Sequence, residues 1–195
     1  MIESKQLPTL KASRVSLRWL TEQDTGALFG IFSNPEVMRF WSCTPYCDVA
    51  EAAALLSEIH DGFAAKTLFQ WGVASNENDT VIGTCTLFKL DAANHRAEIG
   101  YVLGREHWGK GYMGEALERL LEFCFEDLGM TRIEADVDPN NLPSIKSLER
   151  LGFQREGYLR ERWHVGGKVM DSVLYGLLKR EWEARPLSEE KVLPG

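Results

Sequence analysis

The stretch from Ala97 to Met130 constrains the fold most, because it reads as a strand, a glycine-rich loop and a helix in immediate succession. Ala97 to Leu103 is a short apolar run with one charged residue, Glu98. After the loop from Gly104 to Gly114, apolar residues recur at helical spacing with charged residues on the opposite face. The pattern predicts a helix that ends at Gly129, where a left-handed cap favours glycine.

A glycine-rich turn that leads into a helix is typical of a phosphate site, since it presents backbone N–H groups at the positive end of the helix dipole. A P-loop is disfavoured, because Gly109-Lys110 is followed by Gly111 and not by the serine or threonine that binds magnesium. Two other interpretations stay open. One is a dinucleotide fingerprint, which residues 109–114 match literally but without repeated βαβ units after it. The other is an ordinary turn whose glycines serve packing alone.

Composition narrows the class of protein. A chain of 195 residues with 44% hydrophobic and 26% charged residues fits one globular domain. The net charge of −7 disfavours binding to DNA or to an anionic membrane. Without an apolar span or a signal-peptide core, we expect a cytoplasmic protein. We expect no metal site, because the four cysteines lack ligand spacing: Cys43, Cys47, Cys85 and Cys124.

Alternating and helical patterns divide the rest of the chain into short elements. The first 13 residues and the tail after Trp182 look loose. The expected strands cover residues 14–20, 68–75, 80–90, 97–103, 131–138, 153–165 and 168–178. The expected helices follow Asp24, Asp48, the glycine loop and Pro143, with a short helical turn over 35–41. This order predicts an α+β fold with a mixed, mostly antiparallel sheet and helices on both faces.

Two motifs resemble those of the GNAT acetyltransferases. Residues 108–113 resemble the family's coenzyme A loop, Gln/Arg-x-x-Gly-x-Gly/Ala, although Trp108 replaces the Gln or Arg and Met113 replaces a small residue. Residues 141–144, followed by 148–153, resemble the family's second motif. Each match is short, but together they occur in the order and spacing of that family.

The flanking sequence is similar to one branch, the RimJ/RimL-type ribosomal-protein N-terminal acetyltransferases. Residues 14–41 look like the start of such proteins, residues 97–101 like the strand before the loop, and residues 157–178 like the closing hairpin. The resemblance covers residues 14–182. It implies a single domain over 1–195 with the GNAT fold, in which central strands splay apart.

The resemblance also implies a cosubstrate, acetyl-CoA, whose pantetheine arm lies between the splayed strands. The N–H of Leu103 or a near neighbour would face the thioester carbonyl. Backbone N–H groups of the loop would hold the pyrophosphate, and Asn141 and Ser144 would lie near the sulfur. The residues assigned to the cosubstrate are Tyr101, Val102, Leu103, Trp108, Gly109, Lys110, Gly111, Tyr112, Met113, Gly114, Asn141 and Ser144.

Two residues are assigned to catalysis. Glu98 is the expected general base, because attack on a thioester needs a neutral amine; the alternative is a carboxylate on the wet face of the strand. Ser144 is expected to protonate or escort the leaving thiolate; the alternative is a serine that only starts a helix. Many GNAT enzymes use a tyrosine acid, but Leu148 stands at that position, which leaves Tyr158 as a distant alternative.

The expected function is acetyl transfer to a primary amine, either a protein N-terminus or a small molecule, by direct attack in a ternary complex without a covalent intermediate. The alternative is a non-catalytic acyl-CoA-binding module on the same fold. Residues 41–48 and the turn at Gly166 are candidates for the acceptor pocket. Trp41, Trp71 and Trp163 are candidates too, and for each of them the alternative is packing in the core. We expect a monomer or a homodimer.

Overall fold

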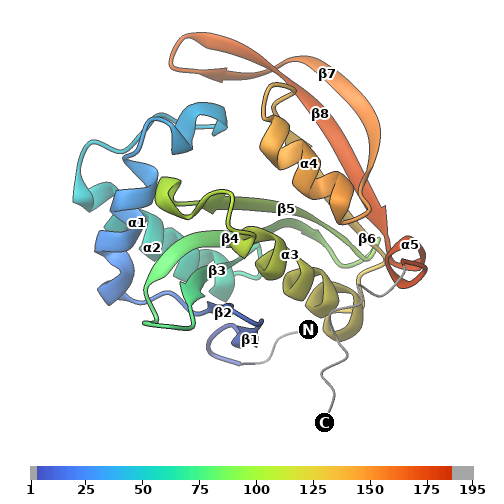
Figure 1. Cartoon of the computed structure of the whole chain (residues 1–195), viewed down its shortest axis with the longest axis horizontal. Coiled ribbons are helices and arrows are strands. Elements are labelled where there is room, and N and C mark those ends of the chain that lie inside the picture. The colour runs from blue at the N-terminus through green and yellow to red at the C-terminus, as the bar shows by residue number, and fades with distance from the viewer. Residues whose placement is uncertain (1–3, 186–195) are drawn as a thin grey trace.

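Eight strands form one sheet in the order β1-β2-β3-β4-β5-β6-β8-β7 in the computed structural model, which describes residues 4–185 (Figure 1). The strands are β1 Leu10–Lys11, β2 Val15–Arg18, β3 Leu68–Ser75, β4 Val81–Asp91, β5 Arg96–Leu103, β6 Arg132–Val137, β7 Gln154–Val165 and β8 Lys168–Leu178. The helices are α1 Thr25–Phe32, α2 Val49–Ala64, α3 Tyr112–Glu122, α4 Leu142–Arg150 and α5 Lys179–Glu183. Short 3-10 turns η1 Glu22–Asp24, η2 Val37–Phe40 and η3 Arg105–His107, and the π-turn η4 Phe123–Asp127, complete the chain.

The predicted α+β fold is confirmed, and the expected strands and helices are present in the expected order. The sequence did not reveal β1 or α5, which are too short to show a period. The lead-in is also less loose than expected, since Leu7 and Leu10 are buried and Leu10 pairs with Leu17. Most of the tail after Trp182 lies outside the described residues.

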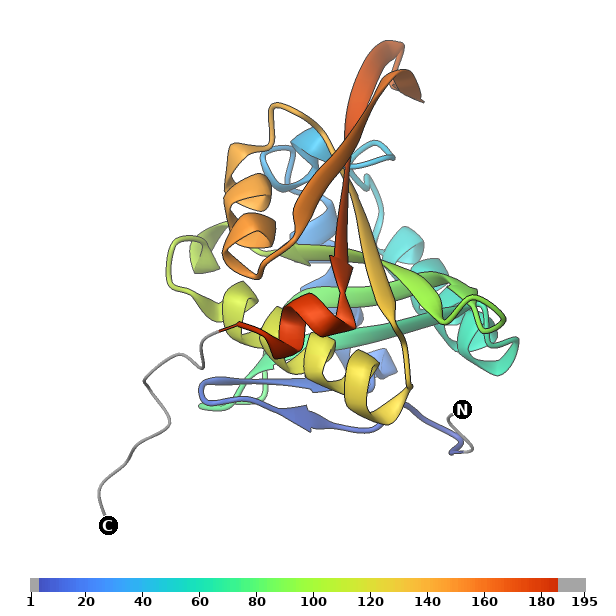
Figure 2. The same ribbon diagram turned by 90° about the vertical axis from the view of Figure 1, so that its right-hand side faces the viewer.

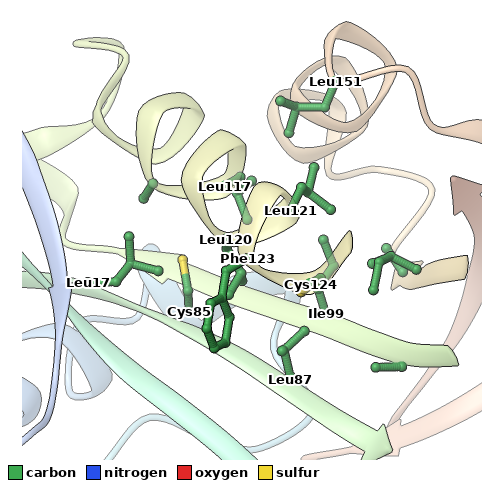
Figure 3. Close-up of a cluster of buried hydrophobic side chains, with 14 of the residues drawn as sticks. Leu17, Cys85, Leu87, Ile99, Leu117, Leu120, Leu121, Phe123, Cys124 and Leu151 are labelled. Atoms are coloured by element: carbon green, nitrogen blue, oxygen red, sulfur yellow. The ribbon is translucent and has the colours of Figure 1, made fainter. Parts of the chain in front are cut away.

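Apolar side chains fill both faces of the sheet. On one face, α3 places Leu117, Leu120 and Leu121 against Leu87 and Ile99 (Figure 3). This confirms the apolar face predicted for that helix. On the other face, α1 and α2 bury a second cluster that includes Leu28, Phe32, Leu56, Ile59 and Val102. The sheet is therefore covered on both sides, and residues of β5 that are adjacent in sequence face different cores.

The pairing between β5 and β6 is parallel, whereas the other strand pairs formed by residues 4–185 are antiparallel. It ends at Ile99 opposite Ala135, although β5 continues for four more residues to Leu103. Beyond this point β6 keeps only β8 as a neighbour, and β7 and β8 run together away from the rest of the sheet (Figures 1 and 2). The centre of the sheet therefore opens where the glycine loop begins.

A buried ion pair fixes the start of α1. Arg18 Nη1 and Nη2 each donate to Asp24 at 2.9 Å, and the Thr21 N–H donates to the same carboxylate at 2.8 Å. Burial by itself would raise the pKa of Asp24, but the hydrogen bonds and the charge of Arg18 outweigh it and hold the pKa below the usual 3.8. This pair stabilises the native state above about pH 4.

We therefore expect stability to fall as the pH drops through 4, because the carboxyl must then take up a proton that its native hydrogen bonds oppose. Asp24→Asn is expected to lower the free energy of unfolding by roughly 2 kcal/mol at pH 7 and to flatten this acid-side loss. Urea unfolding at pH 7, 5 and 3.5 measures both effects. Asp79→Asn is the matched control, because Asp79 pairs with the same Arg18 but is 75% exposed. Equal losses in the two variants would contradict the assignment.

Candidate active site

The glycine loop ends in a helix start that no side chain caps. Gly109 and Gly111 have φ angles of 73° and 85°, and Gly111 is the N-cap residue of α3. Only glycine adopts this left-handed conformation without strain. The first N–H groups of α3 have no side-chain cap, so they are suited to an anion. The residues present therefore fit the pyrophosphate of coenzyme A.

Arg14 adds positive charge at this helix start, a feature that the loop motif does not contain. Its guanidinium lies 4.9 Å from the ring centroid of Tyr112 and forms an ion pair with Glu115. Its backbone N–H also donates to Glu115 at 2.9 Å. The residue just before β2 is thereby tied to the first turns of α3 through a contact between positions 101 residues apart.

Trp108, which replaces the family's Gln or Arg, ties the loop to the end of β5. Its indole Nε1 donates to the carbonyl of Leu103 at 2.7 Å. The guanidinium of Arg105 lies 4.8 Å from its ring centroid. The tryptophan side chain thus holds the loop against the end of β5.

The strand direction decides which N–H groups of β5 face the opening. The N–H of Gly104 donates to Ile82 of β4 at 2.8 Å. Because N–H directions alternate along a strand, those of Tyr101 and Leu103 point away from β4, toward the side where β6 has diverged. Val102 points the other way and its side chain is in the second core, so its expected role in cosubstrate binding is not supported by its position.

A cavity of about 400 Å³ runs through the opening between β5 and β6. It brings together residues from α1, η2, α2, β3, β4, β5, β6, α4 and the β7–β8 hairpin. The lining residues are Phe32, Phe40, Trp41, Ser42, Tyr46, Leu55, Glu58, Leu68, Gln70, Thr86, Phe88, Glu98, Ile99, Gly100, Tyr101, Ala135, Asp136, Val137, Asp138, Asn141, Ser144, Leu148, Trp163, Met170 and Asp171. The cavity therefore contains both residues assigned to catalysis.

Glu98 is a buried carboxylate in the wall of this cavity. The residue is 7% exposed, so the alternative of a solvated strand residue is wrong. Lys89 Nζ donates to its Oε2 at 2.6 Å. A register shift between Phe88 and Asp91 bends β4 here, and Lys89 itself has a φ of 50°. The bulge brings a counter-charge to Glu98 that strand alternation would have placed on the opposite face.

Ser144 lies on the α4 side of the opening. Its Oγ and the hydroxyl of Tyr101 are 2.7 Å apart. Asn141, not Ser144, caps α4, because the Asn141 side chain accepts from the Ser144 N–H at 3.3 Å. Burial raises the pKa of the Tyr101 phenol, which keeps it a proton donor at neutral pH.

Tyr158, the other candidate acid, does not lie beside Ser144 and Tyr101. Its hydroxyl donates to Asp171 at 2.5 Å, and it is not among the described residues that line the cavity. Leu148 forms part of the wall and is 1% exposed. The two hydroxyls that hydrogen-bond to each other on the α4 side of the opening are those of Ser144 and Tyr101.

Two of the three candidate tryptophans line the cavity. Trp41 and Trp163 contribute to its wall, whereas Trp71 is fully buried in the core on the other face and donates to Pro8. For Trp71, the alternative of core packing is therefore the one that the structure shows. A Cβ built on Gly166 would lie 3.6 Å from Thr44, so the hairpin turn and residues 41–48 meet near the cavity.

The two buried cysteines, Cys85 and Cys124, are poorly suited to act as nucleophiles. Burial raises the pKa of the Cys85 and Cys124 thiols, which disfavours thiolate formation.

Within residues 4–185, no group of three or more Cys, His, Asp or Glu residues is placed to hold a metal ion. The described helices also include none that is long and apolar enough to cross a membrane.

The sequence motifs did not identify three side chains of the site: Arg14, Lys89 and Asp136. Arg14 and Asp136 reach their places through contacts between elements remote in sequence, and Lys89 reaches its place through the bulge in β4. A weak signal existed for Asp136, because strict alternation in β6 puts it on the same face as Glu134, the in-register neighbour of Glu98.

Comparisons with known proteins agree with the observed fold. Residues 14–154 match the model of the acetyltransferase (GNAT) domain. An uncharacterized N-acetyltransferase, p20 of Bacillus licheniformis, is 41% identical over 90% of this chain and 99% of its own. The enzyme from Escherichia coli that acetylates an alanine of ribosomal protein uS5 is 26% identical over 89% of this chain and 92% of its own. The structure of spermidine N-acetyltransferase from Vibrio cholerae with CoA and spermine superposes with a TM-score of 0.77 at 23% identity, covering 87% and 98% of the two chains.

Proposed function

The chain belongs to the GNAT family of acetyltransferases and is a RimJ/RimL-like, acetyl-CoA-dependent N-acetyltransferase, and from this premise we propose that it acetylates a primary amine by direct attack in a ternary complex. The amine belongs either to a protein N-terminus or to a small molecule. The cytoplasmic location and the monomeric or homodimeric state stay predictions.

One observation supports this proposal above the others: the cavity reaches both faces of the point where β5 leaves β6. Glu98 opens onto it from the α2 face of the sheet, and the Tyr101–Ser144 pair opens onto it from the α4 side. A base and a hydroxyl pair on opposite sides of one opening suit a reaction in which a proton leaves the nucleophile and another reaches the leaving group.

Acetyl-CoA supplies a thioester, whose C–S bond breaks as the C–N bond to the amine forms. In the proposed mechanism, Glu98 takes a proton from the ammonium, directly or through a water, and so generates the neutral amine. The N–H groups of Tyr101 and Leu103 stabilise the negative charge that develops on the thioester oxygen. Ser144, hydrogen-bonded to Tyr101, delivers a proton to the departing sulfur and regains one from solvent, while the nitrogen of the new amide releases its second proton to solvent. No enzyme side chain becomes acetylated, so no covalent intermediate forms.

The direct test measures free thiol released from acetyl-CoA in the presence of a panel of amines, with both substrates varied. We expect turnover with at least one amine and intersecting double-reciprocal lines, which are diagnostic of a ternary complex. Parallel lines, or a trapped acetyl-cysteine, would contradict direct transfer. Coenzyme A binding by calorimetry without turnover on any amine would support the alternative of a non-catalytic acyl-CoA-binding module.

A further inference from the structure

The acceptor side of the cavity is strongly acidic. Five carboxylates line it: Glu58, Glu98, Asp136, Asp138 and Asp171. Among the described lining residues there is no lysine, arginine or histidine. Low-dielectric walls concentrate the field of such a cluster, so the cavity favours a cation over a neutral or anionic ligand.

Three of these carboxylates already have close partners. Glu98 is matched by Lys89 at 2.6 Å. Asp138 accepts from the N–H of Asn140 at 2.7 Å, and Asp171 accepts from the hydroxyl of Tyr158. Each of them has at least one acceptor site filled within the protein, so acidity alone does not identify a ligand-binding residue.

Asp136 differs, because its side chain is 7% exposed and its Oδ2 is buried without a hydrogen-bond partner. The nearest cation, Nε of Arg162, lies 3.7 Å away, beyond hydrogen-bond distance. A buried carboxylate oxygen carries a free-energy penalty until a donor reaches it. Asp136 lines the cavity, so a rotation of its carboxyl group would present Oδ2 to a donor supplied by a ligand, and that donor would remove the penalty.

Part of the cavity wall is aromatic. Phe32 packs against Trp41 with ring centroids 5.9 Å apart and against Tyr46 at 5.4 Å, and Trp163 lines the hairpin side. Aromatic faces attract ammonium groups, and their apolar surface suits the methylene chain between two nitrogens. A cavity of about 400 Å³ has the size of a small-molecule site.

We propose, on the basis of the acetyl-transfer function above, that the acceptor is a small aliphatic polyamine and that Asp136 binds its second, non-reacting ammonium group. One nitrogen lies at Glu98 and is acetylated. Another stays protonated and donates to Asp136 Oδ2. Asp136 is therefore a specificity-determining residue, and its effect depends on the charge at the far end of the acceptor.

The test compares 1,4-diaminobutane with n-butylamine, which has the same carbon chain and lacks the second nitrogen. For the full-length wild-type protein, we expect kcat/KM for the diamine to exceed that for the monoamine at least tenfold. Asp136→Asn should reduce this ratio by tenfold or more, mainly by raising KM for the diamine, while kcat/KM for n-butylamine changes less than threefold. The ratio between the two proteins cancels the different basicity of the two amines.

Asp127→Asn is the matched control, since Asp127 is exposed at the end of η4 and does not line the cavity. Calorimetry of 1,4-diaminobutane with the coenzyme A-loaded protein gives a readout without turnover, and it should show the same loss of affinity in Asp136→Asn. Far-UV circular dichroism and thermal melts confirm that each variant is folded. If Asp136→Asn does not fold, Asp136→Glu, which keeps the charge and moves it, should still lower the diamine preference.

Failure of this inference is distinguishable from failure of the proposed function. Equal kcat/KM for the two amines, or an equal loss for both in Asp136→Asn, would overturn the inference while acetyl transfer stands. A preference for the N-terminal amine of a peptide without charged side chains over the diamine would also overturn the inference and leave acetyl transfer standing. No turnover with any amine would refute the proposed function itself.

Discussion

Glu98→Gln is expected to lower turnover by about 10²–10⁴-fold at pH 7. Glutamine keeps the shape of the side chain and removes its basicity. Most primary amines are protonated at this pH, since their pKa values lie well above 7. Without a base beside the thioester, only the small neutral fraction of the amine reacts. Turnover of the variant should therefore recover partly as the pH rises and the amine loses its proton without assistance.

Binding separates this effect from damage to the cosubstrate site. Affinity for acetyl-CoA should change little in Glu98→Gln, because Glu98 is on the face that carries the α1 and α2 helices and not on the α4 side. Glu134→Gln is the matched control: Glu134 is the in-register neighbour of Glu98 on β6 but pairs with Arg96 and Arg132 and does not line the cavity. A loss below tenfold in Glu98→Gln, with an unaltered pH profile, would assign the proton transfer to another residue or to bulk water.

The fold was predictable because its signals are local. Strict alternation in residues 131–138 and the helical period after Gly111 each identify an element from a dozen residues or fewer. The hairpins follow from turn residues at short range. The two elements that were missed, β1 and α5, have two and five residues, which is too short for a period to show.

The candidate site was predictable only in part, because most of its contacts are non-local. The loop and Glu98 are found from motifs, but the partner of Glu98 is not: Lys89 reaches it through a bulge that shifts the register of β4. The pairing of Tyr101 with Ser144 joins residues 43 positions apart. The missing hydrogen bond of Asp136 Oδ2 is a property of packing, and no sequence pattern encodes an absent contact.

At Gly111, both the backbone conformation and the space needed by a ligand require a residue without a Cβ. Its φ of 85° is left-handed, a conformation that a β-branched residue adopts only with strain. A Cβ there would lie 3.1 Å from Nη2 of Arg14, so the guanidinium at the helix start would have to move. The side chain would also occupy the space in front of the uncapped N–H groups of α3.

Gly111→Val is therefore expected to reduce coenzyme A affinity by tenfold or more, roughly 1.4 kcal/mol, measured by calorimetry on protein that a thermal melt shows to be folded. Gly114→Ala is the control, because Gly114 lies in the same helix start, has an ordinary φ, and a Cβ there meets no atom within 4 Å. That variant should bind within about twofold, a difference well under 1 kcal/mol. Equal affinities for wild type and folded Gly111→Val would place the pyrophosphate elsewhere, and the positive φ of Gly111 would then serve only the turn into α3. A loss shared by both variants would point to the start of the helix as a whole, not to the left-handed residue that closes the loop.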